Sequence, residues 1–66
     1  MRIVVNGAER EVADGATVAA VLTALGLPSA GVAAAVDGAV VPRAEHVSTV
    51  VAPWAELEVL TAVQGG

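Results

Sequence analysis

The sequence predicts a small α+β domain in which a mixed sheet of four to five strands packs on one helix. Three observations indicate this class: an Asn-Gly hairpin signal at residues 6–7, one amphipathic helix pattern at 18–25, and an alternating strand pattern at 56–63. With 66 residues, the chain has the length of one domain, and it buries only about 60% of the surface that its unfolded form exposes. We assign residues 1–63 to the domain and 64–66 to a flexible tail.

The N-terminal residues predict a β-hairpin. Ile3 and Val5 share one face of the first strand, Asn6-Gly7 is a strong tight-turn pair, and residues 9–12 provide the returning strand. We therefore expect a two-residue turn that fixes the register of both strands.

A helix is the most regular element that the sequence predicts. Thr17 occupies the N-cap position, and Gly26 and Pro28 are placed to end the helix. Apolar residues recur between them at the spacing of one helical face: Val18, Val21, Leu22 and Leu25. This face is expected to be core.

The middle of the chain predicts a second hairpin. Residues 31–36 are almost entirely apolar, which favours a central strand buried on both faces. Asp37-Gly38 is a tight-turn pair that leads into Val40-Val41. Residues 43–53 predict turns and a short helical piece.

The alternation at 56–63 defines two faces of the last strand. Leu57, Val59 and Val63 lie on one face and are expected to point inward with Ile3 and Val5. Leu60 and Val4 then fall on the opposite, open face, where we expect them to dock partner proteins. The element order strand, strand, helix, strand, short strand, last strand describes a β-grasp (ubiquitin-like) sheet wrapped on one helix.

Composition excludes several classes of function. The formal net charge is −4 and the three basic residues, Arg2, Arg10 and Arg43, are scattered, so we expect no nucleic-acid partner. No apolar run approaches the roughly 20 residues that span a bilayer, and the N-terminal residues lack a signal-peptide core. We therefore expect a cytoplasmic protein without a membrane partner.

The absence of two residue types narrows the chemistry further. The chain has no cysteine, which excludes disulfides, a thiolate nucleophile and a side-chain persulfide, and it has no lysine to serve as an acyl acceptor. Its one histidine, His46, has no companion for a metal site or a catalytic dyad. Trp54, the one aromatic residue, is expected to cover one end of the core, with an interface anchor as the alternative. The chain does not look like an enzyme, and no metal or bound cofactor is expected.

The C-terminal residues Gln64, Gly65 and Gly66 suggest a reactive tail. Glycine packs against nothing, but a Gly-Gly filament can thread a narrow channel and present the carboxylate of Gly66 to a partner. That carboxylate is an anion and a poor electrophile, so acyl transfer requires activation, for example attack on the α-phosphate of ATP to give an acyl-adenylate. A frayed terminus that merely happens to be rich in glycine is the alternative from the tail alone.

Four segments along the chain form one ordered set of motifs: Ile3-Val4-Val5-Asn6-Gly7, Thr17-Val18 before Leu22, Val36-Asp37-Gly38 followed by Val41-Pro42-Arg43, and Leu57-Glu58-Val59 leading to Ala62-Val63-Gln64-Gly65-Gly66. In this order and at this length they resemble the ThiS family, the ubiquitin-like sulfur carriers of thiamine biosynthesis. One departure concerns Trp54-Ala55, which stand where the family usually carries a Gly-Asp turn before the last strand. The residues that lead into that strand therefore differ from the family pattern.

This resemblance implies partners and a mechanism. A ThiF-like adenylyltransferase would consume ATP to adenylate Gly66, and a persulfide from a cysteine desulfurase or rhodanese-type donor would convert it to a thiocarboxylate. A ThiG-like thiazole synthase would receive the sulfur. The small subunit of molybdopterin synthase is one alternative, although it carries Phe and Pro residues before its glycines, and residues 60–64 contain neither. A covalent protein modifier, which would pass Gly66 to an amine of a target, is the other.

Overall fold

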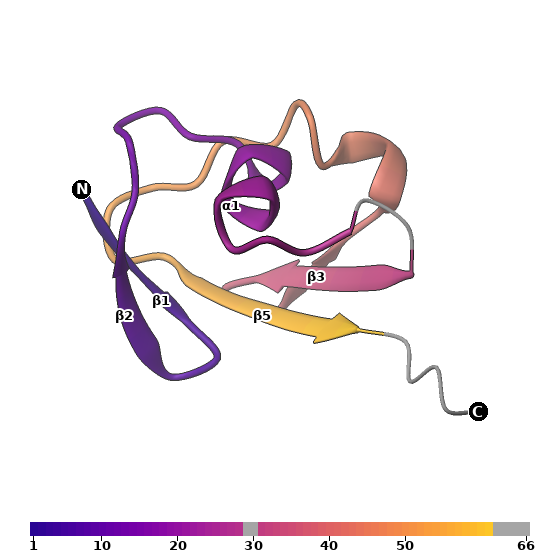
Figure 1. Cartoon of the computed structure of the whole chain (residues 1–66), viewed down its shortest axis with the longest axis horizontal. Helices are drawn as coiled ribbons and strands as arrows, with labels where there is room; N and C mark the ends of the chain where they lie inside the picture. The colour runs from indigo at the N-terminus through magenta and orange to yellow at the C-terminus, as the bar shows by residue number, and fades with distance from the viewer. Residues whose placement is uncertain (29–30, 62–66) are drawn as a thin grey trace.

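The computed structural model describes residues 1–28 and 31–61 of the chain. Its elements are β1 (Arg2–Val5), β2 (Ala8–Glu11), α1 (Val18–Ala24), β3 (Val32–Val36), β4 (Ala39–Val41), the 3-10 turn η1 (Arg43–Glu45) and β5 (Glu56–Thr61). The strands form one sheet in the order β2-β1-β5-β3-β4, in which only β1 and β5 pair in parallel. Helix α1 lies against one face of this sheet (Figure 1). The predicted β-grasp class is confirmed.

Both predicted hairpins form around turns of the same type. Asn6 and Gly7 have φ values of 49° and 83°, and Asp37 and Gly38 have values of 50° and 86°. Positive φ at both central residues defines a type I′ turn, whose twist matches that of antiparallel strands. These turns fix the pairing of Val5 with Ala8 in the first hairpin.

Helix α1 is capped at both ends as the sequence predicts. The Thr17 hydroxyl accepts a hydrogen bond of 3.1 Å from the amide of Ala20, a contact that contributes about 1 kcal/mol in helices generally. At the other end the amide of Gly26 donates to the carbonyl of Thr23, and the amide of Leu27 donates to that of Leu22. This pair of bonds is a Schellman motif, and the φ of 76° at Gly26 supplies its left-handed residue.

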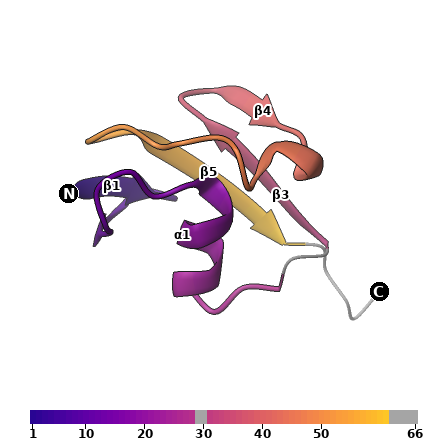
Figure 2. The ribbon, with the colours of Figure 1, turned by 90° about the horizontal axis from the view of Figure 1, so that it is seen from above.

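The core lies between α1 and the sheet. The segment between β4 and β5 covers the start of the helix, since the amide of Val18 donates to the carbonyl of Thr49 and that of Val51 donates to Ala16. Figure 2 shows α1 and this segment on one side of the sheet. Both elements contribute to the buried apolar cluster, which contains Ile3, Val5, Val18, Val21, Leu22, Val32, Ala34, Val51, Ala55 and Leu57.

The prediction for β3 was wrong about its burial. Ala33 is exposed while Val32 and Ala34 are buried, so the strand is covered on one face only. Its interior place in the sheet is confirmed, since β3 pairs with β5 on one side and β4 on the other, while β5 is the middle strand. A run of small apolar residues suits an open face as well as a buried one, because alanine exposes little apolar surface.

Two further predictions concern the second half of the chain. The short helical piece predicted within residues 43–53 is η1. The strand predicted to continue to Val63 is β5, which ends at Thr61; Ala62 and Val63 lie outside the described residues. Within residues 1–28 and 31–61, no helix has the length and apolar character to cross a bilayer.

Candidate functional site

The face of the sheet that points away from α1 carries an apolar patch. Its centre is Leu60 on β5 and Val40 on β4, which are 74% and 77% exposed. Ala33, Ala35 and Val4 complete the patch, and together with neighbouring residues it lines an open hollow of about 580 Å³. We call these five residues the open-face patch.

Strand register explains why the patch forms. Leu60 pairs with Ala33, and Val40 pairs with Ala35, so two large side chains flank a row of alanines. Because alternate residues of a strand point to opposite faces, burial of Leu57 sends Leu60 outward. The predicted outward orientation of Leu60 therefore agrees with the structure. Val4 is half-buried and lies between two buried neighbours, Ile3 and Val5.

Carboxylates lie among and beside the residues of the open-face patch. Glu9 and Glu56 pair with Val4 from the two strands beside it, and Glu58 pairs with Ala35. Arg2 is on the same face of the sheet, but its guanidinium lies 3.7 Å from Glu11. Within the described residues, none of Glu9, Glu56 and Glu58 forms an ion pair. The open face thus combines exposed apolar side chains with the carboxylates of Glu56 and Glu58, which lie on β5 between Val4 of β1 and Ala35 of β3.

Asn6 ties β5 to the first hairpin, a role that sequence reasoning missed. Its side-chain Nδ2 donates to the carbonyl of Val59 at 3.1 Å, and its Oδ1 accepts from the amide of Val59 at 2.9 Å. Its backbone amide also donates to the carbonyl of Leu57. The sequence pattern of Asn6-Gly7 predicts only the turn.

Asp37 plays the corresponding part in the second hairpin. Its Oδ1 accepts a hydrogen bond of 2.9 Å from the amide of Glu56, and its own amide donates to the Glu56 carbonyl. In each type I′ turn, the side chain of the first left-handed residue therefore forms hydrogen bonds with the backbone of β5. The strand that leads to the C-terminal residues is held from both neighbouring hairpins.

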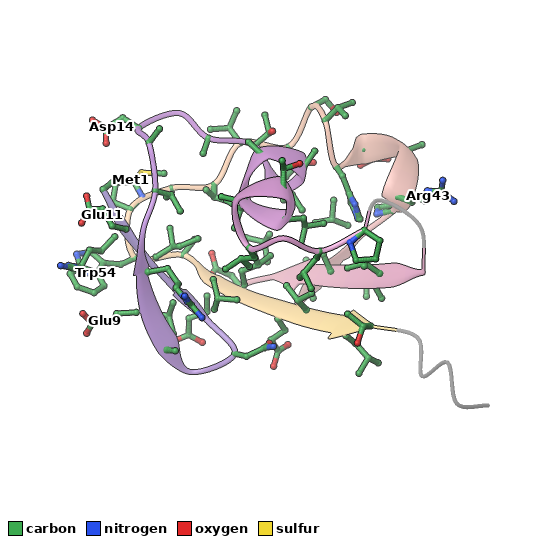
Figure 3. The ribbon with its side chains drawn as sticks, in the orientation of Figure 1. Met1, Glu9, Glu11, Asp14, Arg43 and Trp54 are labelled. Carbon is green, nitrogen blue, oxygen red and sulfur yellow. The ribbon has the colours of Figure 1, made fainter. Side chains whose placement is uncertain are left out.

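The start of β5 departs from the prediction for Trp54. The Trp54 side chain is 58% exposed, and Figure 3 shows it projecting away from the ribbon. Trp54 does not cover the core because its φ of 64° turns the side chain outward, and the next residue, Ala55, is buried instead. The family's usual glycine adopts this left-handed conformation without strain. Trp54 adopts it too, and β5 begins normally at Glu56.

His46 is a structural residue. It is 5% exposed, and its Nε2 lies 3.1 Å from the carbonyl of Val41. Its own carbonyl accepts the amide of Ala19 at the start of α1. No group of three acidic, histidine or cysteine side chains suited to a metal ion occurs among residues 1–28 and 31–61.

The predicted reactive residues Gln64, Gly65 and Gly66 lie outside the described residues. What the structure describes is the strand that precedes them, which ends at Thr61 beside Val32 of β3. Leu60 is the residue immediately before Thr61. The open-face patch thus reaches the end of the strand from which the tail departs.

Comparison with known proteins decides the family. The model of the ThiS family matches residues 3–66, which include both C-terminal glycines. The chain belongs to the ThiS family. Membership supports a role as a sulfur carrier of thiamine biosynthesis, as the resemblance in motifs implied.

Two solved structures are similar over the whole chain. One is the crystal structure of the thiamine biosynthesis protein ThiS from Geobacter metallireducens, with 30% identity, a TM-score of 0.83 and complete coverage of both chains. The other is a solution structure of a thiamine biosynthesis protein from Geobacter metallireducens, with 29% identity and a TM-score of 0.84, covering this chain fully and 88% of that one. No protein of curated function matches. The ThiS relatives share the β-grasp fold described above.

Proposed function

We propose that this ThiS protein carries sulfur on the carboxyl carbon of Gly66 and delivers it for thiazole formation. The protein acts as a recyclable cosubstrate of partner enzymes: its C-terminal carboxylate reacts, and none of its side chains is required for acid–base or nucleophilic chemistry. The observation that carries this proposal is the match of the ThiS family over residues 3–66, which extends through the reactive glycine. The absence of cysteine leaves the C-terminus as the place for transferable sulfur.

The proposed chemistry has two activating steps. An oxygen of the Gly66 carboxylate attacks the α-phosphate of ATP on a ThiF-like enzyme, and pyrophosphate leaves. The terminal sulfur of a donor persulfide then attacks the acyl carbon, and AMP leaves. Reduction of the resulting acyl disulfide by a thiol gives the thiocarboxylate, whose sulfur passes to a ThiG-like thiazole synthase. ATP is therefore a substrate of the partner, and no cofactor is resident on this chain.

The open-face patch is the proposed docking surface for the adenylating partner. Leu60 and Val4 supply its apolar contacts, and an exposed apolar cluster next to a reactive segment is typical of an interaction site. Glu9, Glu56 and Glu58 favour a partner surface with arginine or lysine opposite these carboxylates. Complementary charge of this kind accelerates association and orients the two proteins.

Two other classes of protein use the same activated C-terminal carboxyl group. A molybdopterin synthase small subunit is not favoured, because residues 60–64 lack the Phe and Pro residues of that family and the ThiS family matches instead. A covalent modifier uses the same activated carboxyl group but transfers it to a lysine of another protein. The product of the reaction distinguishes this class from a sulfur carrier.

The test is a reconstitution followed by intact-mass measurement. Incubated with its adenylating partner, ATP, a persulfide donor and a thiol, the protein is expected to gain the mass of one sulfur in place of one oxygen on its C-terminal peptide. Two matched controls, deletion of Gly66 and addition of one residue after it, should remain unmodified while keeping the fold. A full exchange in the extended control would contradict the proposal.

A further inference from the structure

The α-ammonium of Met1 is held by three acceptors at one end of the sheet. It donates to the carbonyl of Val12 at 2.7 Å, to Oδ1 of Asp14 at 3.0 Å and to Oε2 of Glu11 at 3.2 Å. The Met1 side chain is only 8% exposed and packs on the core. Figure 3 shows Met1 between Asp14 and Glu11. An ammonium has three protons, so these acceptors match its full donor capacity.

This group is the one primary amine in the printed sequence, since the chain has no lysine. An acyl-adenylate at Gly66 is vulnerable to any free amine. The nitrogen lone pair attacks the acyl carbon, an amide bond forms, the bond from that carbon to AMP breaks, and the proton lost from nitrogen goes to solvent. A protonated amine has no lone pair and cannot react.

We infer that Glu11 and Asp14 protect the activated protein from self-conjugation by holding the Met1 amine as a hydrogen-bonded ammonium. This inference rests on the proposed function. The hydrogen bond to Asp14, followed by that to Glu11, raises the pKa of the Met1 α-amine above its ordinary value of 8.0. Arg2, the remaining charged neighbour of the cluster, lies 3.7 Å from Glu11 and so partly offsets that carboxylate.

The reaction that must be avoided joins two copies of the chain. Because Val4 pairs in parallel with Glu56, Met1 lies at the end of the sheet where β5 begins. Thr61, the last residue of β5, lies at the opposite end. At about 3.3 Å per residue this separation is roughly 25 Å. Five residues follow Thr61, and their contour is at most about 18 Å. The tail therefore falls short of its own Met1, and the acceptor would be Met1 of a second copy.

The first arm of the test measures amine protection directly. The full-length protein is treated with an acetylating succinimidyl ester at pH 7, and intact mass follows one acetyl group per chain. We expect the E11Q/D14N variant to react at least about threefold faster than wild type, because the rate follows the free-base fraction. The charge-matched variant E9Q/E45Q should react at the wild-type rate. In guanidinium chloride all three proteins should react alike.

The wild-type protein alone also decides this arm if the E11Q/D14N variant is poorly folded. Native wild type must react more slowly than the same protein in denaturant, after correction for the effect of denaturant on a model α-amine. Equal rates would overturn the inference. So would an intact mass showing that the purified protein does not begin with a free Met1 amine.

The second arm uses the adenylating partner and ATP without a sulfur donor. E11Q/D14N should accumulate two chains joined with loss of one water, with the new amide at Met1, whereas wild type should remain as the adenylate. An adenylated double variant that forms no joined chains overturns the inference and leaves the proposed function intact. Failure of wild type to form any adenylate overturns the proposed function, and with it the reason for protection, while the first arm still reports whether the amine is shielded.

Discussion

Asn6 bonds both backbone groups of Val59 with the two ends of its side-chain amide, at 3.1 and 2.9 Å. The side chain takes the place of a backbone pair and extends the contact of the first hairpin with β5 beyond the last paired residues, Val5 and Leu57. Because Val59 lies two residues before the end of β5, this contact positions the segment that leads to the tail.

Replacing Asn6 should therefore lower the free energy of unfolding by more than the change in turn conformation alone would. In N6G the φ of 49° is tolerated and only the two hydrogen bonds are lost, so we expect the free energy of unfolding to fall by about 1–2 kcal/mol. N6D keeps the acceptor but loses the donor, and should fall between wild type and N6G. Urea denaturation measures both. An unchanged midpoint in N6G would show that the side-chain bonds contribute nothing.

Leu60 should matter for binding and little for stability. L60R places a charge at the centre of the open-face patch, and we expect it to weaken binding of the adenylating enzyme by about 2 kcal/mol or more, as losses at interface hot spots do. Calorimetric titration and thermal unfolding measure the two effects separately. V47R, at a 73% exposed residue outside the open-face patch, is the matched control. Normal binding by folded L60R would remove Leu60 from the interface.

Glycine and alanine variants of Trp54 should differ in stability in the opposite sense from the usual one. At a φ of 64°, glycine should be more stable than alanine by about 1 kcal/mol, whereas alanine is the better residue in helices and strands. We expect W54G to unfold at a higher denaturant concentration than W54A. The reverse order would indicate that the turn does not hold the left-handed conformation.

Stability should decline at alkaline pH through the Met1 ammonium. Asp14 and Glu11 raise the pKa of this amine above 8.0 in the folded state. A raised pKa stabilises the fold fully below the unfolded value, and this contribution is lost as pH rises through the folded value. The midpoint temperature of thermal unfolding of the wild-type protein should therefore fall as the pH rises above about 8, and it should fall more steeply than that of E11Q/D14N. The same pH dependence in both proteins would contradict the contact of the Met1 ammonium with Asp14 and Glu11.

Local signals account for what the sequence predicted. Asn6-Gly7, Asp37-Gly38 and the Thr17 cap each specify a conformation within a few residues, and all three form as expected. Alternation along β5 was sufficient to orient Leu60. Periodicity of two fixes the facing of a whole strand once one side is buried.

Long-range contacts account for what the sequence did not predict. Asn6 and Val59 are 53 positions apart, and no local pattern relates them. The middle position of β5 follows from its parallel pairing with β1, which depends on packing around α1. The size and apolar character of Trp54 predict a buried side chain, but the left-handed backbone of the turn directs that side chain outward. The contacts of the Met1 amine have no signature in side-chain patterns.

The most direct test of the sulfur-carrier function is the intact mass of the protein purified from its own host under sulfur-limited growth. We expect a species in which one sulfur replaces one oxygen, assigned by fragmentation to the peptide that ends in Gly66. A protein recovered only as unmodified chain and as amide-linked conjugates to lysines of other proteins would contradict this function and favour a covalent modifier.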